Sequence, residues 1–218
     1  MPVLLELFCG TKSIGKVFDQ NGWDVVSVDM LSKFEPTICK NLLDLTPQDI
    51  KDKLPAHAKQ ITLIWASPPC TQYSKCRTQG GPRDLDGSDR LVQKVLDLVK
   101  YFNVPYFFME NPQTGLLKSR NVVKGIPYRI IDYCSYADDL FPGRYRKRTA
   151  IFTNTDWIPM RALCKPSLCK FCSDGKKHDH ACQQRNKPGQ MKSTTKQLYK
   201  IPSALPQELL NYFQGTRS

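Results

Sequence analysis

Short apolar runs that end at proline, glycine or acidic residues recur along the first two thirds of the chain. Runs of this length without turn residues indicate buried strands, and apolar residues three or four positions apart indicate helices. The expected strands are Val3–Phe8, Asp24–Val28, Ile61–Ala66, Tyr106–Met109, Ile130–Tyr133 and Thr149–Asn154. The expected helices are Val17–Gly22, a longer one from Ser88 or Asp89 to Val99, and a short one from about Pro206. Strands that alternate with helices predict an α/β fold with a mainly parallel sheet.

A cysteine follows the third expected strand at a rigid turn. Pro68 and Pro69 stop this strand after Ala66, because proline cannot donate to a sheet ladder, and Cys70 comes next. A cysteine on such a turn, at the carboxyl end of a strand, is well placed to act as a nucleophile. The alternative is a structural thiol that caps the loop, because reactivity depends on the surroundings of the sulfur. Residues 71–88 lack periodicity and are expected to form a loop.

A glutamate leaves the next expected strand in a similar way. Glu110 follows Tyr106–Met109 and comes shortly before Pro112. A single helix is expected between this strand and the one before Cys70, and parallel strands connected in this way often lie side by side. We therefore expect Cys70 and Glu110 to share one cleft.

A glycine-containing turn, residues 9–15, joins the first strand to the first helix, and Asp29 ends the second strand. This order is suited to holding an adenosine group, because the glycines let the backbone approach the ligand and the acid accepts bonds from ribose hydroxyls. Asp44 lies beyond another short apolar run. It can accept a bond from an adenine amino group, or it can belong to the cap region of a helix that starts at Pro47.

The composition is that of a globular protein without a membrane span. The chain has 218 residues, of which 40% are hydrophobic, and its mean hydropathy is −0.44. Its apolar runs are far shorter than the roughly 20 residues that cross a bilayer. The first residues lack the basic region and cleavage site of a signal peptide, so we expect an intracellular, non-secreted protein. The nine cysteines then point to thiols and metal rather than disulfides.

Nearly all of the net charge of +12 lies in one part of the chain. From Arg144 to Lys200 there are 14 Lys and Arg against three Asp, a net charge of +11. Such an asymmetry favours a surface that binds a polyanion, with nucleic acid preferred over membrane because the segment has no basic amphipathic helix. The alternative is a solvated basic face.

Cysteines and histidines cluster within this basic part. The cluster contains Cys164, Cys169, Cys172 and Cys182, with His178 and His180 before the last cysteine. Cys-x2-Cys spacing is typical of zinc knuckles, and four thiolates can close a tetrahedral zinc site. We expect these four cysteines to hold a structural zinc ion, with either histidine as an alternative ligand in place of Cys164 or Cys182. The other interpretation is a loop of reduced bystander thiols, and Cys134 is expected to be a packing or incidental thiol.

Taken together, the motifs resemble those of the cytosine C5 DNA methyltransferase family. The matching segments are residues 6–15, Asp29-Met30, Asp44-Leu45, Ser67-Pro68-Pro69-Cys70 with Gln72 and Ser74, Met109-Glu110-Asn111, and Arg146-Lys147-Arg148. They occur in the family's usual order between about residues 3 and 154. The shortness of the chain and its compact C-terminus look more like the small members from phages and large DNA viruses than like full-length restriction-system enzymes. The resemblance implies a Rossmann-like class I methyltransferase fold that uses S-adenosylmethionine, here with a small C-terminal zinc-knuckle insertion.

The resemblance also assigns roles to the catalytic residues. The Cys70 thiolate would add to C6 of a flipped-out cytosine, which makes C5 nucleophilic toward the methyl group. Glu110 in its protonated form would donate to N3 as charge builds on the ring. Arg148, with Arg146 beside it, would stabilise the charge at O2. The residues implied to contact the cofactor are Phe8, Gly10, Thr11, Ser13, Ile14, Gly15, Asp29, Met30, Asp44, Leu45 and Pro68.

The chain departs from the family's pattern after Asn154. Only about 64 residues follow, and they contain no Gly-Asn pair of the kind that completes the family's cofactor pocket. We expect a catalytic domain at residues 1–160, a basic zinc-binding module at 161–190 that contacts DNA, and a C-terminal tail at 191–218 that packs on the catalytic domain. Two alternatives stay open: the same chemistry on RNA such as a tRNA, and a catalytically degenerate nucleic-acid-binding protein.

Overall fold

The computed structural model describes residues 1–77, 81–137, 144–182, 188, 191 and 194–215. The expected loop at 71–88, the expected module at 161–190 and the expected tail each include residues outside this described part. Among the described residues, no helix combines the length and the apolar character needed to cross a bilayer.

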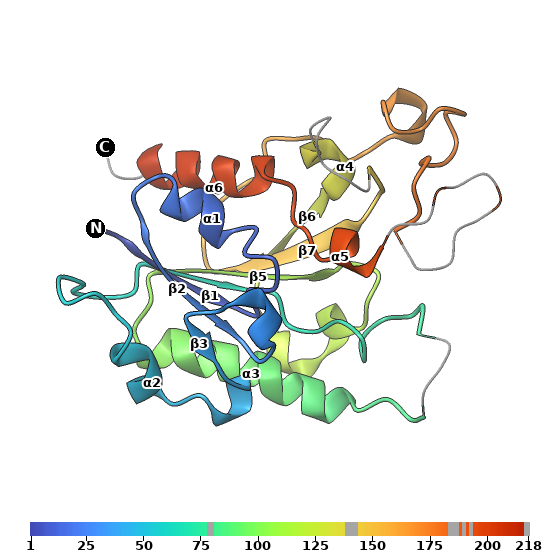
Figure 1. Ribbon diagram of the computed structural model, residues 1–218. Helices are drawn as coiled ribbons and strands as arrows, with labels where there is room; N and C mark the ends of the chain where they lie inside the picture. The colour runs from blue at the N-terminus through green and yellow to red at the C-terminus, as the bar shows by residue number, and fades with distance from the viewer. Residues whose placement is uncertain (78–80, 138–143, 183–187, 189–190, 192–193, 216–218) are drawn as a thin grey trace.

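A seven-stranded sheet forms the centre of the molecule (Figure 1). The strands are β1 (Val3–Leu7), β2 (Asp24–Asp29), β3 (Ile38–Cys39), β4 (Leu63–Ala66), β5 (Tyr106–Pro112), β6 (Tyr128–Asp132) and β7 (Arg148–Thr153). Their order is β3-β2-β1-β4-β5-β7-β6. The first five strands of this order are parallel to one another, and β7 runs antiparallel to both β5 and β6. The carboxyl ends of β1, β2, β4 and β5 therefore meet at one edge of the sheet.

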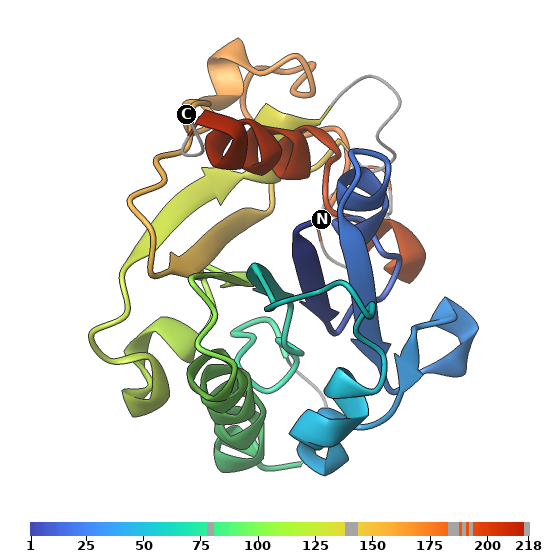
Figure 2. The same ribbon diagram turned by 90° about the vertical axis from the view of Figure 1, so that its left-hand side faces the viewer.

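Helices cover both faces of the sheet (Figures 1 and 2). The α-helices are α1 (Gly15–Asp19), α2 (Pro47–Lys51), α3 (Leu85–Tyr101), α4 (Tyr133–Tyr136), α5 (Thr195–Leu198) and α6 (Ala204–Gly215). Short 3-10 helices are η1 (Ser32–Phe34), η2 (Leu42–Asp44), η3 (Leu117–Ser119), η4 (Asn121–Val123) and η5 (Pro166–Leu168). In Figure 1, α1 and α6 lie above the sheet, and α2 and α3 lie below it. The predicted α/β fold class is confirmed.

Alternate residues of the buried strands supply two separate cores, because successive side chains of a strand point to opposite faces. Leu5 belongs to the core under α3, together with Val92 and Val95 of that helix. Leu4 belongs to the core under α1 and α6, together with Phe213. Both strand leucines are fully buried. The C-terminal helix is thus part of the same folded unit as the sheet.

The observed elements differ from the predicted ones mainly at their ends. Helix α3 begins earlier than expected, because Asp84 caps it by accepting a hydrogen bond from the backbone N–H of Gly87 at 2.7 Å. The short run around Asp44 forms the 3-10 helix η2, and the next helix does begin at Pro47, where Thr46 closes a capping box. The predicted strand at Ile130–Tyr133 is β6, which ends one residue earlier because Tyr133 starts α4. The two-residue strand β3 was not predicted.

Candidate active site

The turn after β1 has an unusual backbone. Phe8, Gly10 and Lys12 have positive φ angles of 57°, 47° and 55°. Left-handed residues that are not glycine are uncommon and cluster at ligand sites. The backbone N–H of Gly10 donates to Oδ2 of Asp29 at 3.0 Å, and the N–H of Leu31 donates to Oδ1 of the same residue at 2.9 Å. A carboxylate can accept further bonds, so Asp29 is fixed against this turn while remaining able to bind hydroxyl groups.

A buried glutamate supports the same turn from below. Glu6 is 2% exposed, and its Oε1 accepts a hydrogen bond from the backbone N–H of Ile14 at 3.3 Å. Burial raises the pKa of Glu6 to about 7. A Cβ atom on Gly15 would lie 2.5 Å from Oε2 of Glu6. Glycine is therefore required at position 15 for close packing of the helix start against this carboxyl group.

Cys70 and Glu110 come from neighbouring strands, as predicted. Ala66, the last residue of β4, pairs with Met109 of β5, so the segment that carries Cys70 leaves the sheet beside Glu110, which still lies within β5 and pairs with Ile151 of β7. The side chain of Asn111 donates to the carbonyl oxygen of Pro68 at 3.1 Å and ties the two segments to each other. Burial raises the pKa of the Cys70 thiol, the charge of Lys147 lowers it, and Glu110 raises it.

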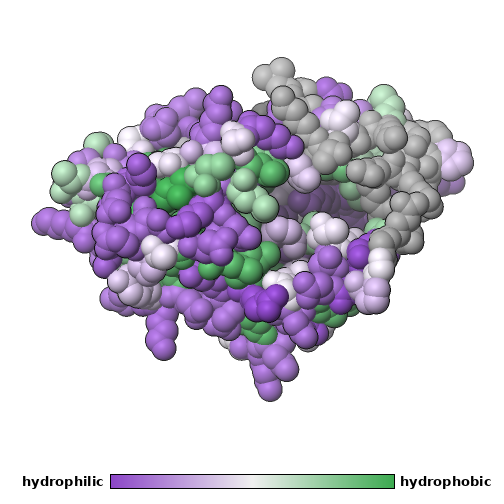
Figure 3. Space-filling model, turned by 60° about the horizontal axis from the view of Figure 1, so that its bottom comes forward, coloured by the Kyte–Doolittle hydropathy of each residue, from purple (hydrophilic) through white to green (hydrophobic). Residues whose placement is uncertain are grey.

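One cavity of about 380 Å³ joins the turn after β1 to these two residues. The cavity is partly open, and the face turned forward in Figure 3 is hollowed near its middle. Of the residues predicted from the sequence, the cavity is lined by Phe8, Gly10, Ser13, Asp29, Met30, Pro68, Cys70 and Glu110. Its described lining does not include Thr11, Ile14, Gly15, Asp44, Leu45, Arg146 or Arg148.

The predicted residues that do not line the cavity have other places in the fold. Leu45 is fully buried in the core under α3, and Asp44 is exposed on η2, whose neighbouring residues Leu42 and Leu43 line the cavity instead. The backbone at Ile14 and Gly15 packs against Glu6, as described above.

The C-terminal tail supplies cavity residues that were not among those predicted to contact the cofactor, although the sequence left open whether the tail around Tyr199–Leu210 completes the pocket. Leu198, Tyr199 and Ile201 line the cavity. The backbone N–H of Ile201 donates to Oγ of Ser13 at 3.2 Å, which attaches the tail to the turn after β1. The only sequence signal for this contact was negative, because the chain lacks the Gly-Asn pair expected in this region.

The two arginines before and within β7 bind a buried aspartate. Asp132 is fully buried and accepts hydrogen bonds from Arg148, at 3.1 Å from Nε and 2.8 Å from Nη2, and from Nε of Arg146 at 3.5 Å. Of the three consecutive basic residues 146–148, it is Lys147 that lines the cavity, and its Nζ lies 3.2 Å from Oε1 of Glu110. The structure thus brings Cys70 and Glu110 together, but it places Arg146 and Arg148 on Asp132.

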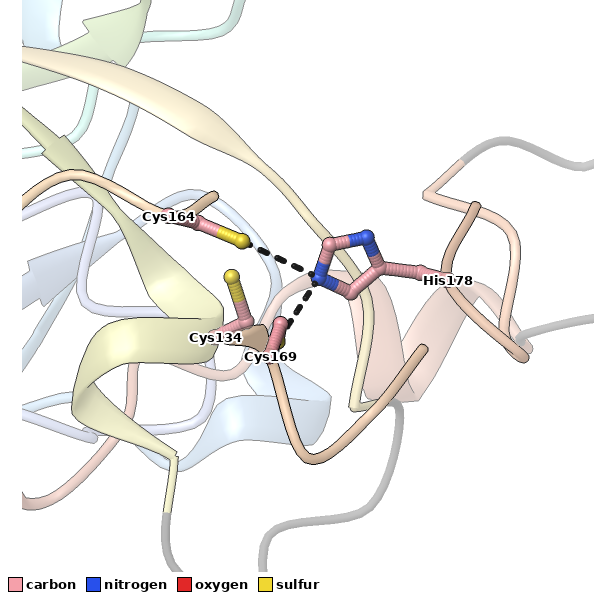
Figure 4. A group of neighbouring side chains, drawn as sticks. All are labelled: Cys134, Cys164, Cys169 and His178. Carbon is pink, nitrogen blue, oxygen red and sulfur yellow. Dashed lines mark hydrogen bonds between the residues drawn. The ribbon is translucent and has the colours of Figure 1, made fainter. Parts of the chain in front are cut away.

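A second cluster contains side chains that could hold a metal ion (Figure 4). One ligand atom each from Cys134, Cys164, Cys169 and His178 lies within 4.8 Å of all the others. The Sγ atoms of Cys164 and Cys169 lie 3.6 and 3.3 Å from Nε2 of His178. Three thiols and an imidazole at this separation can hold a metal ion in tetrahedral geometry.

This group differs from the ligand set predicted from spacing. Cys134 belongs to the group, although it was expected to be a packing or incidental thiol, because α4 brings it to the cluster from 30 positions before Cys164. Cys172 lies on the other side of the imidazole, with its Sγ 3.3 Å from Nδ1 of His178. Cys182 is exposed and outside the group, and His180 instead forms an isolated β-bridge with Met191.

The cluster is joined to the arginine pair. The backbone N–H of Cys164 donates to Oδ2 of Asp132 at 3.0 Å, and Cys134 follows Asp132 by two positions. The buried aspartate therefore connects β6 and β7 with the segment that carries the metal-ligand candidates.

Known proteins resemble this chain in sequence and in fold. A family model described as C-5 cytosine-specific DNA methylase matches residues 3–127. The chain is 29% identical over 225 residues to a Frog virus 3 (isolate Goorha) protein named "Probable DNA (cytosine-5)-methyltransferase", with 95% of this chain and 98% of that protein covered. It is 28% identical over 122 residues to the type II methyltransferase M.XorII of Xanthomonas oryzae pv. oryzae, with 50% of this chain and 28% of that protein covered.

Among solved structures, the methyltransferase EhMeth of Entamoeba histolytica matches with a TM-score of 0.51 and 16% identity. The match covers 77% of this chain and 59% of that one, so the chain spans less than two thirds of that structure. At this identity the likeness concerns the fold.

Proposed function

This chain belongs to the C-5 cytosine-specific DNA methylase family, and we propose that it transfers a methyl group from S-adenosylmethionine to C5 of a cytosine in DNA. The observation that carries the proposal is the shared cavity. Cys70 and Glu110 line the same cavity as the turn after β1 and Asp29. In this proposal, one base bound in the cavity would meet a nucleophile and a proton donor, with the candidate nucleoside site in the same cavity.

The cavity has features that fit S-adenosylmethionine. Asp29 is oriented by two backbone N–H groups and would accept bonds from the ribose hydroxyls. The Glu6 carboxyl group lines the cavity, and its buried Oε2 has no hydrogen-bond partner among the described residues. Leu42, Leu43 and Tyr199 would enclose the adenine with apolar side chains. When bound, the cofactor supplies an electrophilic methyl group on a sulfonium.

The reaction assigns one step to each catalytic side chain. The Cys70 thiolate forms a bond to C6, the C5–C6 π electrons shift into the ring, and N3 takes a proton from Glu110. The cofactor held beside Asp29 would supply the methyl group that C5 takes up, and its sulfonium would leave as a neutral thioether. A base removes the C5 proton, the C6–S bond breaks, Cys70 leaves as a thiolate and Glu110 regains its proton. Because C5 and C6 are inaccessible within a duplex, the cytosine has to flip into the cavity.

We also propose that Cys134, Cys164, Cys169 and His178 hold a structural zinc ion. The soft donor set suits zinc, and the contact between Sγ of Cys172 and Nδ1 of His178 would orient the imidazole. The ion would attach the basic segment that carries Cys164, Cys169 and His178 to α4, which carries Cys134. Several exposed lysines of this segment would contact DNA phosphates, namely Lys165, Lys170, Lys176 and Lys177.

Transfer of labelled methyl groups tests the proposed function. The protein is incubated with S-adenosyl-[methyl-³H]methionine and either duplex DNA or tRNA, and the nucleosides are analysed by mass spectrometry. We expect 5-methyldeoxycytidine from DNA, no product with Cys70→Ala, and full activity with Cys39→Ala, an exposed cysteine outside the cavity. Product only in RNA would assign the same chemistry to the other substrate, and no product with either would indicate a non-catalytic binding protein.

A further inference from the structure

The side chain of Lys147 lines the cavity, whereas those of the arginines on either side of it bind Asp132. Successive side chains of an extended segment point to opposite sides. The segment before β7 is extended and held in place, because the carbonyl oxygen of Lys147 accepts a hydrogen bond from the backbone N–H of Tyr133 at 3.1 Å. Arg146 and Arg148 therefore share one side, where both bind Asp132, and Lys147 points to the other.

The ammonium group of Lys147 lies among the catalytic side chains. Its Nζ is 3.2 Å from Oε1 of Glu110, and the two side chains are 22% and 7% exposed. Its Nζ also lies 4.8 Å from the ring centroid of Tyr133, which is fully buried. The side chain lines the cavity together with Cys70. A cation in such a partly dehydrated place interacts more strongly with a nearby charge than it would in water.

The chemistry of the cytosine ring selects the atom that this cation would meet. Two exocyclic groups flank N3, the amino group on C4 and the carbonyl oxygen O2. A lysine ammonium group can only donate hydrogen bonds, so it cannot pair with the amino group and can pair with O2. A lysine next to Glu110 is therefore suited to bind O2 while Glu110 serves N3.

We propose that Lys147 is a catalytic residue that binds O2 of the flipped cytosine and stabilises the negative charge that forms on the ring when Cys70 adds to C6. The proposal rests on the proposed function and gives Lys147 the role that the family resemblance gives to Arg148. Lys147 keeps its proton throughout, and the proton that N3 takes comes from Glu110. Its positive charge also favours the Cys70 thiolate against the effect of burial.

The test compares Lys147→Met, Lys147→Gln and Lys147→Arg with wild type in single-turnover methyl transfer to duplex DNA. Loss of one donor to a developing oxyanion lowers rates by about 10²–10³-fold, so we expect a loss of this size for Met and Gln. Lys147→Arg keeps the charge and should lose less than about tenfold. Lys100→Met, at an exposed residue of the last turn of α3, removes one charge that does not line the cavity and should leave the rate unchanged.

A second measurement does not require methyl transfer. Alkylation of Cys70 by iodoacetamide is followed against pH by peptide mass spectrometry, without DNA or cofactor. The midpoint should move to higher pH in Lys147→Met and Lys147→Gln and stay near wild type in Lys147→Arg. If either neutral variant fails to fold, the other is compared with Lys147→Arg at equal folded fraction, as judged by circular dichroism.

The two proposals fail in different ways. If wild type transfers methyl groups and the folded neutral variants do so at the same rate, Lys147 is not catalytic and the proposed function stands. An unchanged alkylation midpoint in the neutral variants would also contradict the placement of Lys147 beside Cys70. If wild type transfers no methyl group to any nucleic acid, the proposed function is overturned and the role of Lys147 at O2 with it.

Discussion

Replacing Asp132 by asparagine should destabilise the protein strongly. This buried carboxylate at the end of β6 binds two arginines and the backbone of Cys164, a candidate metal ligand. It accepts bonds from Arg148 at 3.1 and 2.8 Å, from Arg146 at 3.5 Å and from the backbone N–H of Cys164 at 3.0 Å. Asparagine has the same shape but loses the charge, and its NH₂ group would face a guanidinium. Removal of one partner of a buried ion pair typically costs about 3–5 kcal/mol.

The expected cost of Asp132→Asn is somewhat smaller than that range. The side chains of Arg146 and Arg148 are 35% and 32% exposed, so water can partly replace the lost partner. We therefore expect a loss of about 2–4 kcal/mol in the free energy of unfolding. At roughly 2–4 °C per kcal/mol for a chain of this size, Tm should fall by about 4–16 °C.

Urea denaturation followed by circular dichroism measures this effect, with Asp86→Asn as the matched control. Asp86 also pairs with an arginine, Arg120, at 3.0 Å, but its side chain is 96% exposed. Exposed ion pairs contribute little to stability, so the control should unfold close to wild type. Equal midpoints for the two variants would refute the view that Asp132 holds Arg146 and Arg148 in a structural role.

Three further predictions concern the turn after β1 and the metal-ligand cluster. Gly15→Ala should lower the free energy of unfolding by about 1–3 kcal/mol in urea denaturation, because its Cβ would lie 2.5 Å from a Glu6 carboxylate oxygen. Gly215→Ala should not lower it, because a Cβ at that position meets open space. Burial raises the pKa of Glu6 to about 7, so its neutral form stabilises the fold at low pH and this contribution is lost as pH rises through about 7. Wild type should therefore lose up to about 3 kcal/mol relative to Glu6→Gln between pH 5 and pH 8, and parallel pH dependences would contradict the burial of an ionisable carboxyl group. Cys134→Ser should lower the zinc content measured by atomic absorption, whereas Cys182→Ser should leave it unchanged. The reverse result would favour the ligand set predicted from spacing, which contains Cys182 and lacks Cys134.

Features encoded in contiguous residues were predictable. Proline cannot donate a hydrogen bond to a sheet ladder, so Pro68 and Pro69 mark the end of the buried strand before them. The position of Cys70 at the sheet edge therefore followed from the sequence alone. The neighbouring position of Glu110 followed from the rule that one helix joins adjacent parallel strands. The family was also recognisable from these motifs and is confirmed by the family model.

Features that depend on strand register or on distant contacts were not predictable. Whether Lys147 or Arg148 faces the cavity depends on the pairing of β7, and a shift of one residue exchanges the two sides. Cys134 reaches the metal-ligand cluster only because β6 and α4 carry it there, which no local spacing shows. The two residues of β3 give too short a pattern to be distinguished from a loop.

The central claim, that Cys70 forms a covalent bond to C6 of a cytosine, can be tested by trapping the adduct. Duplex DNA that contains 5-fluorocytosine is incubated with the protein and S-adenosylmethionine, and the products are resolved under denaturing conditions. After methyl transfer, fluorine at C5 blocks the loss of a proton that would release the enzyme, so the adduct accumulates. We predict a denaturant-resistant complex in which mass spectrometry locates the modification at Cys70, and none with Cys70→Ala. No adduct with wild type, or an equal yield with Cys70→Ala, would contradict the claim.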